Sequence, residues 1–304
     1  YSQKGTKYGR AYRNSRLGRD SLWFGWIRPV RLRKLNEPRI PRMRATGVSI
    51  PQHPTTNNQH PSDKSFLQNE LTKLKIMKFG IIVFPGSNCD RDVATVTEGI
   101  FRQPTRYVWH QETELSDLDV IVVPGGFSYG DYLRCGAIAR FSPAMKTVRE
   151  EAEKGKLVLG ICNGFQVLTE IGLLPGALIR NRDLHFICDR VPVKVENNQS
   201  VWTRGYQPQQ VLNLPIAHGE GRYYAAEDTL KSLEDNGQIL FRYCTATGEA
   251  NESGNPNGSL NNIAGITNKA GNVLGMMPHP ERAADPLLNL TDGSLLFEEI
   301  INCC

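Results

Sequence analysis

The chain has 304 residues, of which 39% are hydrophobic, which is enough to bury one domain of ordinary size with length to spare. It contains no run of 18 apolar residues and no secretory signal, which argues against a membrane protein. Its seven cysteines include no Cys-x-x-Cys pair, so we expect neither a disulfide framework nor a metal site. These features favour a soluble protein of the cytoplasm.

The formal charge of +5 is unevenly distributed along the chain. Residues 1–76 hold 16 Lys and Arg against 4 Asp and Glu, whereas residues 77–304 hold 20 against 27. The first segment has no sustained period of 2 or 3.6 residues, so we interpret it as a basic, disordered leader or as non-native sequence upstream of a start at Met77. A transit peptide and a nucleic-acid-binding arm are the functional alternatives. The acidic remainder argues against nucleic acid as a partner, because it would repel phosphates.

From Met77 onward, strand-like apolar runs alternate with helical segments, which predicts an α/β fold with a mostly parallel central sheet flanked by helices. The predicted strands of that sheet are 79–84, 105–109, 120–123 and the run before Cys162, and the predicted helices are 90–100, 144–154 and the segment after Cys162. The later part looks richer in strands and predicts an antiparallel extension, with strands 191–195, 212–217, 238–243 and 262–267. Ligands of such sheets bind beyond the carboxyl ends of the parallel strands.

Residues 160–166 (GICNGFQ) carry the first candidate for chemistry. They follow an apolar run and precede a helical pattern, so they predict a tight turn that presents Cys162 at a helix N-terminus. The helix dipole and the unpaired N–H groups there favour the thiolate, which is the nucleophilic form of cysteine. A buried core cysteine is the alternative interpretation.

Residues 278–281 (PHPE) supply a candidate base and its partner. The two prolines favour an extended backbone, in which His279 and Glu281 point to the same side. The carboxylate can then accept a hydrogen bond from the imidazole and fix its tautomer. Spacing alone does not show that His279 meets Cys162, because that contact depends on the fold.

Residues 124–131 (PGGFSYGD) follow a predicted buried strand. Consecutive glycines let the backbone approach a ligand and aim N–H groups at it. Beside a cysteine nucleophile this arrangement predicts an oxyanion hole, with donors from Gly125 and Gly126 and from the N–H of Asn163. A structural or phosphate-binding turn is the alternative, although a P-loop is excluded because no Gly-Lys-Ser/Thr follows.

These motifs, in this order on an alternating α/β chain, resemble those of the class I (triad) glutamine amidotransferases, whose fold is flavodoxin-like. Four segments narrow the resemblance to the glutaminase subunits of phosphoribosylformylglycinamidine synthase: 84–90 (FPGSNCD), 124–136, 160–166 and 217–223 (AHGEGRY). The resemblance covers residues 77 to about 301 and predicts a single amidotransferase domain over 77–304.

The resemblance implies hydrolysis of glutamine to glutamate, with ammonia passed to a synthetase that makes formylglycinamidine ribonucleotide in purine biosynthesis. It assigns Cys162 as the nucleophile that forms a thioester, His279 as the acid and base, and Glu281 as the residue that orients His279. By analogy Gln166 holds the amino-acid end of the substrate, with helix packing as the alternative. The chain itself needs no cofactor or metal, since ATP and magnesium belong to the synthetase.

The resemblance also implies partners, namely a large synthetase subunit and a small bridging subunit. No ATP-binding region is visible after residue 76, so we expect the ammonia-consuming half on another polypeptide. We expect His218, Glu220 and Arg222 in a glycine-flanked loop, which the family places at the active-site mouth or the subunit interface. The alternative is that His218 is merely a solvated loop residue. A cysteine hydrolase of the DJ-1/PfpI-like kind is the second enzyme interpretation, although such proteins carry histidine where this chain has Asn163.

Overall fold

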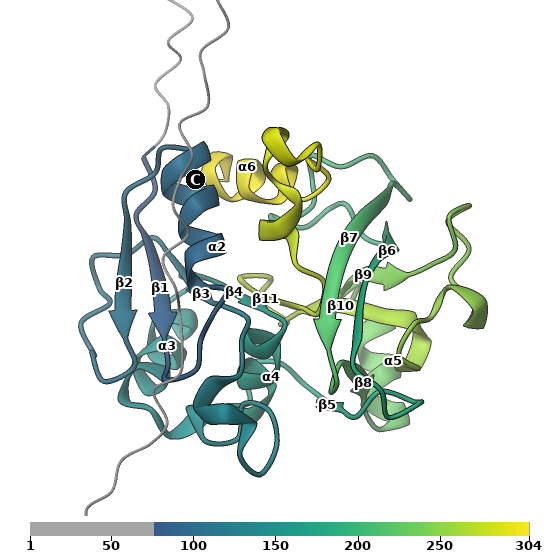
Figure 1. The fold of residues 1–304 in the computed structure, drawn as a ribbon, viewed down its shortest axis with the longest axis horizontal. Helices are drawn as coiled ribbons and strands as arrows, with labels where there is room; N and C mark the ends of the chain where they lie inside the picture. The colour runs from purple at the N-terminus through teal and green to yellow at the C-terminus, as the bar shows by residue number, and fades with distance from the viewer. Residues whose placement is uncertain (1–75, 304) are drawn as a thin grey trace, which may run out of the picture. The chain divides into compact units, whose positions relative to one another are not determined.

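The computed structural model describes residues 76–303. The predicted leader, residues 1–76, lies outside this range except for Ile76, and Cys304 also lies outside it. The described part is built on a nine-stranded sheet in the order β2-β1-β3-β4-β11-β10-β9-β6-β7 (Figure 1). None of its helices has the length and apolar character to cross a membrane.

The first five strands in this order run parallel and confirm the predicted central sheet. Strands β3 and β4 are buried along their whole length, as expected of strands covered on both faces. The parallel strands are β2 (Thr105–Trp109), β1 (Phe79–Val83), β3 (Val120–Val123), β4 (Leu157–Ile161) and β11 (Val273–Met276). β11 was not predicted from the sequence, although it precedes the PHPE segment directly.

The remaining four strands pair antiparallel and confirm the predicted extension. They are β10 (Ile263–Thr267), β9 (Ile239–Tyr243), β6 (Ile187–Val195) and β7 (Val211–His218). A separate two-stranded sheet pairs β5 (Ala177–Ile179) with β8 (Arg222–Tyr224), and neither of these strands was predicted.

Helices lie on both sides of the parallel strands (Figure 1). The predicted helix after β1 begins as α2 (Asp90–Ala94) and continues as a π-helix, Thr95–Ile100. α2 and α6 (Ser294–Asn302) lie on one side of the sheet, whereas α3 (Pro143–Glu153) and α4 (Asn163–Glu170) lie on the other (Figure 1). α5 (Glu227–Asp235) precedes β9. α5 and α6 were not predicted.

The topology brings the candidate residues to one edge of the sheet. β11 pairs in parallel with β4, with Met276 opposite Ile161, so both strands end at the same level. The backbone N–H of Cys162 donates to the carbonyl of Met276 at 2.8 Å. The chain leaving β4 toward Cys162 and the chain leaving β11 toward His279 therefore start side by side at the carboxyl edge, where ligands of parallel sheets bind.

Candidate active site

Cys162 occupies a strained turn between β4 and α4, as the sequence predicts. Its backbone has φ 50° and ψ −106°, a conformation that side-chain-bearing residues rarely adopt, and it immediately precedes the first residue of α4. The close packing of this turn depends on Gly164, where a side chain would collide with the carbonyl oxygen of Val123. The thiol of Cys162 is 5% exposed and lies 3.7 Å from the carbonyl oxygen of Ala217.

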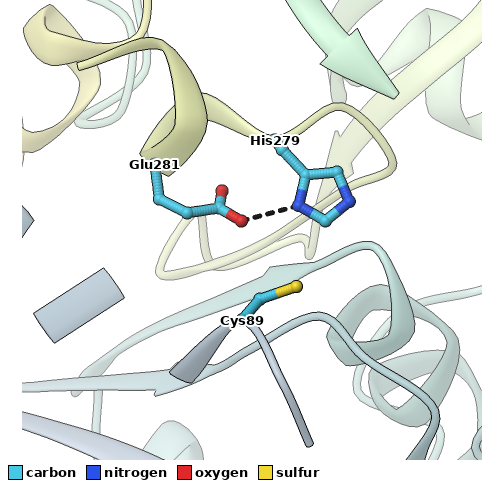
Figure 2. A group of neighbouring side chains, drawn as sticks. All are labelled: Cys89, His279 and Glu281. Atoms are coloured by element: carbon cyan, nitrogen blue, oxygen red, sulfur yellow. Dashed lines mark hydrogen bonds and ion pairs between the residues drawn. The ribbon is translucent and has the colours of Figure 1, made fainter. Parts of the chain in front are cut away.

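His279 and Glu281 form a buried pair in which Nδ1 donates to Oε1 at 2.6 Å (Figure 2). The predicted contact is present, but the extended backbone from which it was predicted is wrong. Residues Pro280–Ala283 form a 3₁₀ turn, and His279 lies just before it. The contact forms at the start of this turn, where His279 is the residue before Pro280, and the His279 N–H is fixed by the carbonyl of Pro215 at 2.8 Å.

The charges around His279 stabilise its imidazolium form. Burial opposes that form, but the carboxylate of Glu281 and the sulfur of Cys162 outweigh burial and raise the pKa of His279 well above its usual range. With Nδ1 bound to Glu281, the other ring nitrogen, Nε2, is buried without a hydrogen-bond partner among the described residues. Nε2 is therefore the atom free to exchange a proton with a ligand.

Gly125 lies against the same centre. A Cβ atom built on Gly125 would lie 2.8 Å from Cε1 of His279, 3.0 Å from Sγ of Cys89 and 3.5 Å from Cβ of Cys162. The glycine thus leaves open the space between nucleophile and base. The backbone N–H groups of Gly125 and Gly126 donate to no acceptor within residues 76–303 and are available as oxyanion donors.

Asn163 connects the glycine loop, residues 124–131, to the turn that contains Cys162. Its side-chain oxygen accepts from the N–H of Ser128 at 3.1 Å, and its amide nitrogen donates to Gln166 Oε1 at 2.9 Å and to Asp131 at 3.3 Å. Because Asn163 is the first residue of α4, its own backbone N–H has no acceptor within the helix. The predicted oxyanion donors therefore come from two segments that one buried side chain holds together.

Gln166 is buried, and both polar atoms of its side-chain amide are hydrogen-bonded. Besides accepting from Asn163, it donates through Nε2 to the backbone carbonyl of Glu220 at 2.6 Å. In this arrangement Gln166 joins α4 to the segment between β7 and β8. Its role in holding the amino-acid end of a substrate stays a prediction.

His218 is not a solvated loop residue, since it ends β7 and is 3% exposed. Its Nδ1 lies 3.1 Å from Asn181 Oδ1, and its Nε2 is buried without a partner in the described part of the chain. Burial, and then the charge of His279, lower the pKa of His218 to about 4. Glu220 accepts from the N–H of Cys135 at 3.3 Å, and Arg222 begins β8. A role for these three residues at the mouth of the site or at a subunit interface stays a prediction.

Cys89 is a residue of this centre that sequence reasoning missed. Its thiol is 2% exposed, lies beside the imidazole of His279 (Figure 2), and accepts from Arg282 Nη2 at 3.1 Å. Burial raises the pKa of the Cys89 thiol, and the neighbouring His279 and Arg282 partly oppose that shift. The available signal was its position in the turn after β1, which ends at the same edge of the sheet as β4.

Comparison with known proteins identifies the family of this chain. Residues 77–291 match the model of the CobB/CobQ-like glutamine amidotransferase domain. Phosphoribosylformylglycinamidine synthase subunit PurQ of Synechocystis sp. is 75% identical over 72% of this chain and 98% of its own length, and that of Acaryochloris marina is 70% identical over 74% and 96%. A chain in the structure of PurLQS from Thermotoga maritima is 41% identical, with a TM-score of 0.66 over 75% of this chain and 98% of that one. The chain therefore belongs to the PurQ family of glutamine amidotransferases.

Proposed function

We propose that this chain hydrolyses glutamine to glutamate and ammonia as the glutaminase subunit of phosphoribosylformylglycinamidine synthase. The observation that carries the proposal is the meeting of three elements at one sheet edge: the strained Cys162, the buried pair of His279 and Glu281, and the unpaired N–H groups of the glycine loop. The high identity to PurQ proteins supports the particular reaction, because the overlap covers nearly their whole length.

In the first half of the reaction, the thiolate of Cys162 attacks the side-chain amide carbonyl of glutamine. The negative charge that develops on the carbonyl oxygen is stabilised by the N–H groups of Asn163 and of Gly125 or Gly126. His279 donates a proton from Nε2 to the departing nitrogen, so the C–N bond breaks, ammonia leaves and a thioester remains. The raised pKa of His279 keeps this proton available near neutral pH.

In the second half, neutral His279 takes a proton from water as the water oxygen attacks the thioester carbonyl. The same N–H groups stabilise the second tetrahedral intermediate. Its collapse breaks the C–S bond, releases glutamate and returns Cys162 as the thiolate beside a protonated imidazole. Glu281 holds the ring by its Nδ1 throughout, and we propose Gln166 as a contact for the amino-acid end of the substrate.

We further propose that the ammonia is consumed by a large synthetase subunit, assembled with this chain through a small bridging subunit, in the cytoplasm. ATP and magnesium act on that synthetase, whereas the chemistry of the Cys162 site requires no cofactor. Exposed apolar side chains beyond the glycine loop support an interface there, since Tyr132 is 73% and Leu133 is 89% exposed. Both follow Gly125 by no more than eight residues, so we propose this surface as the contact with the partner subunits.

The test is glutamate release from glutamine by the purified chain, with and without its synthetase partners. Replacement of Cys162 by Ala should abolish release, whereas replacement of the exposed Cys188 by Ala should leave it unchanged. We expect a weak rate in isolation that rises on complex formation. Undiminished release by the Cys162→Ala variant would refute the assignment, and equal rates with and without the partners would refute the coupling.

A further inference from the structure

Tyr129, in the glycine loop, has a backbone conformation that its side chain makes unfavourable. It lies at φ 53° and ψ 29°, in the left-handed region where a Cβ atom crowds the neighbouring carbonyl group. Glycine adopts this conformation without strain, as Gly130 does at the next position with φ 68°. The tyrosine side chain must therefore make contacts that outweigh the strain.

The phenol of Tyr129 is hydrogen-bonded to two buried side chains from other elements. Its hydroxyl oxygen lies 2.8 Å from Nδ1 of His110 and 2.9 Å from Oγ of Ser142. These two residues are 8% and 5% exposed, and His110 directly follows β2. The backbone of His110 is fixed as well, because its N–H donates to the carbonyl of Val83 and its carbonyl accepts from the N–H of Ala144, both at 3.0 Å. Tyr129 thus attaches the loop to well-anchored neighbours.

Ser142 makes this contact instead of capping its own helix. It is the N-cap residue of α3, and serine is favoured there because its hydroxyl accepts from a free N–H of the first helical turn. The Ser142 side chain makes no such bond, and its hydroxyl is hydrogen-bonded to Tyr129. The strained backbone of Tyr129 and the missing side-chain cap of α3 are two separate costs that the same hydroxyl contact offsets.

Other bonds hold the glycine loop to the turn after β1 and to α4. The N–H groups of Phe127 and Tyr129 donate to carbonyls of the turn after β1, at 3.1 Å and 2.6 Å. The N–H of Ser128 donates to the side chain of Asn163 at 3.1 Å. The Tyr129 hydroxyl adds a connection to the end of β2 and the start of α3, so without it the loop loses its attachment to those two elements.

We propose that Tyr129 is a positioning residue for the hydrolysis of glutamine. Its two hydroxyl contacts keep the N–H groups of Gly125 and Gly126 at the place where the oxyanion forms. The inference rests on the proposed function of the chain, and Tyr129 acts in it through the backbone of the loop. Oxyanion donors matter most when charge develops on the carbonyl oxygen, so a misplaced loop slows the reaction without weakening the binding of glutamine.

The experiment compares Tyr129→Phe, which removes only the hydroxyl, with the unmodified full chain, each assembled with its synthetase partners. A misplacement of about 1 Å costs on the order of 100-fold in rate, and the loop keeps its other bonds, so we expect kcat about tenfold lower and KM within about twofold. Tyr107→Phe is the matched control, because Tyr107 is 49% exposed on β2 and loses the same hydroxyl. It should leave both constants unchanged.

A second readout separates a displaced loop from damage to the fold or to the nucleophile. Iodoacetamide alkylates the Cys162 thiolate by displacing iodide, a reaction that forms a C–S bond without an oxyanion. The alkylation rate, followed by mass spectrometry of the peptide that contains Cys162, should stay within about twofold in Tyr129→Phe. A thermal melt checks that the variant is folded at the assay temperature.

A double-mutant cycle tests whether Tyr129 acts through its partner. Ser142→Ala should lower kcat by less than Tyr129→Phe does, because one of the two hydroxyl contacts remains. The double variant should be no slower than Tyr129→Phe alone, because the contact that Ser142→Ala removes is already lost.

A kcat of Tyr129→Phe within about twofold of the unmodified chain would overturn the inference, and so would an equal fall in kcat and in the alkylation rate. Additive effects of Tyr129→Phe and Ser142→Ala would overturn it too, since the two residues would then act independently. An unmodified complex that releases no glutamate would refute the proposed function and this inference with it. Normal release by the unmodified complex and by Tyr129→Phe alike would refute this inference alone.

Discussion

Substitution of Gly125 by Ala should impair catalysis while the domain stays folded. The new methyl group would lie 2.8 Å from Cε1 of His279, and ordinary contact begins at 3.4 Å, so the ring must retreat by about 0.6 Å. His279 is 1% exposed and bound to Glu281, so it has little room to move. Because a misplacement of about 1 Å costs on the order of 100-fold in rate, we expect kcat/KM to fall about 10- to 100-fold, or about 1.4 to 2.7 kcal/mol.

The assay is glutamate release across a range of glutamine concentrations, together with a thermal melt. Gly99→Ala is the control, because its methyl group would meet only Thr95 Cγ2, at 3.9 Å, and it should leave kcat/KM unchanged. Overpacking at Gly125 should lower the free energy of unfolding by no more than about 1 to 3 kcal/mol. A folded Gly125→Ala variant with kcat/KM within twofold of the unmodified chain would refute the placement of the glycine loop against the reacting groups.

Two further predictions concern buried ionisable groups. The pKa of His218 is lowered to about 4, below its unfolded value of 6.5, so His218 should reduce stability by up to about 3 kcal/mol as pH falls from 6.5 toward 4. Urea unfolding at pH 7 and pH 4.5 should show that the His218→Gln variant does not lose this stability. The same pH dependence of the free energy of unfolding in the variant and the unmodified chain would contradict the prediction. Glu281→Gln removes the carboxylate that raises the pKa of His279, so the alkaline limb of kcat/KM should move to lower pH, with a rate about 10² to 10⁴ lower. An unmoved limb would show that another group supplies the proton.

Prediction from sequence succeeded where local pattern determines structure. β3 and β4 were predictable because each is a continuous apolar run that ends in a turn, and the parallel sheet followed from their alternation with helices. β11 was missed because Gly275 interrupts its four residues, so it lacks the continuous apolar run that identifies β3. The contact of His279 with Glu281 was predicted from an extended backbone, whereas a 3₁₀ turn makes it.

The contact between Cys89 and His279 could not be predicted from local sequence patterns. Cys89 and His279 are 190 positions apart, and they meet because the strands that precede them, β1 and β11, end at the same edge of one sheet with β3 and β4 between them. Strand order depends on how the whole chain packs, and the spacing of Cys89 and His279 along the sequence does not reveal it. A search for short sequence motifs therefore does not find a cluster that tertiary structure assembles.

The backbone conformation that Cys162 adopts reduces the stability of the domain. At φ 50° and ψ −106° a side chain costs on the order of 1 to 3 kcal/mol, and glycine would relieve most of it. Selection for a durable fold alone would therefore replace the cysteine by glycine. A chain that had lost its activity but kept its fold could acquire glycine at this position and become more stable to heat. Cysteine at this position therefore indicates that the reaction has been retained.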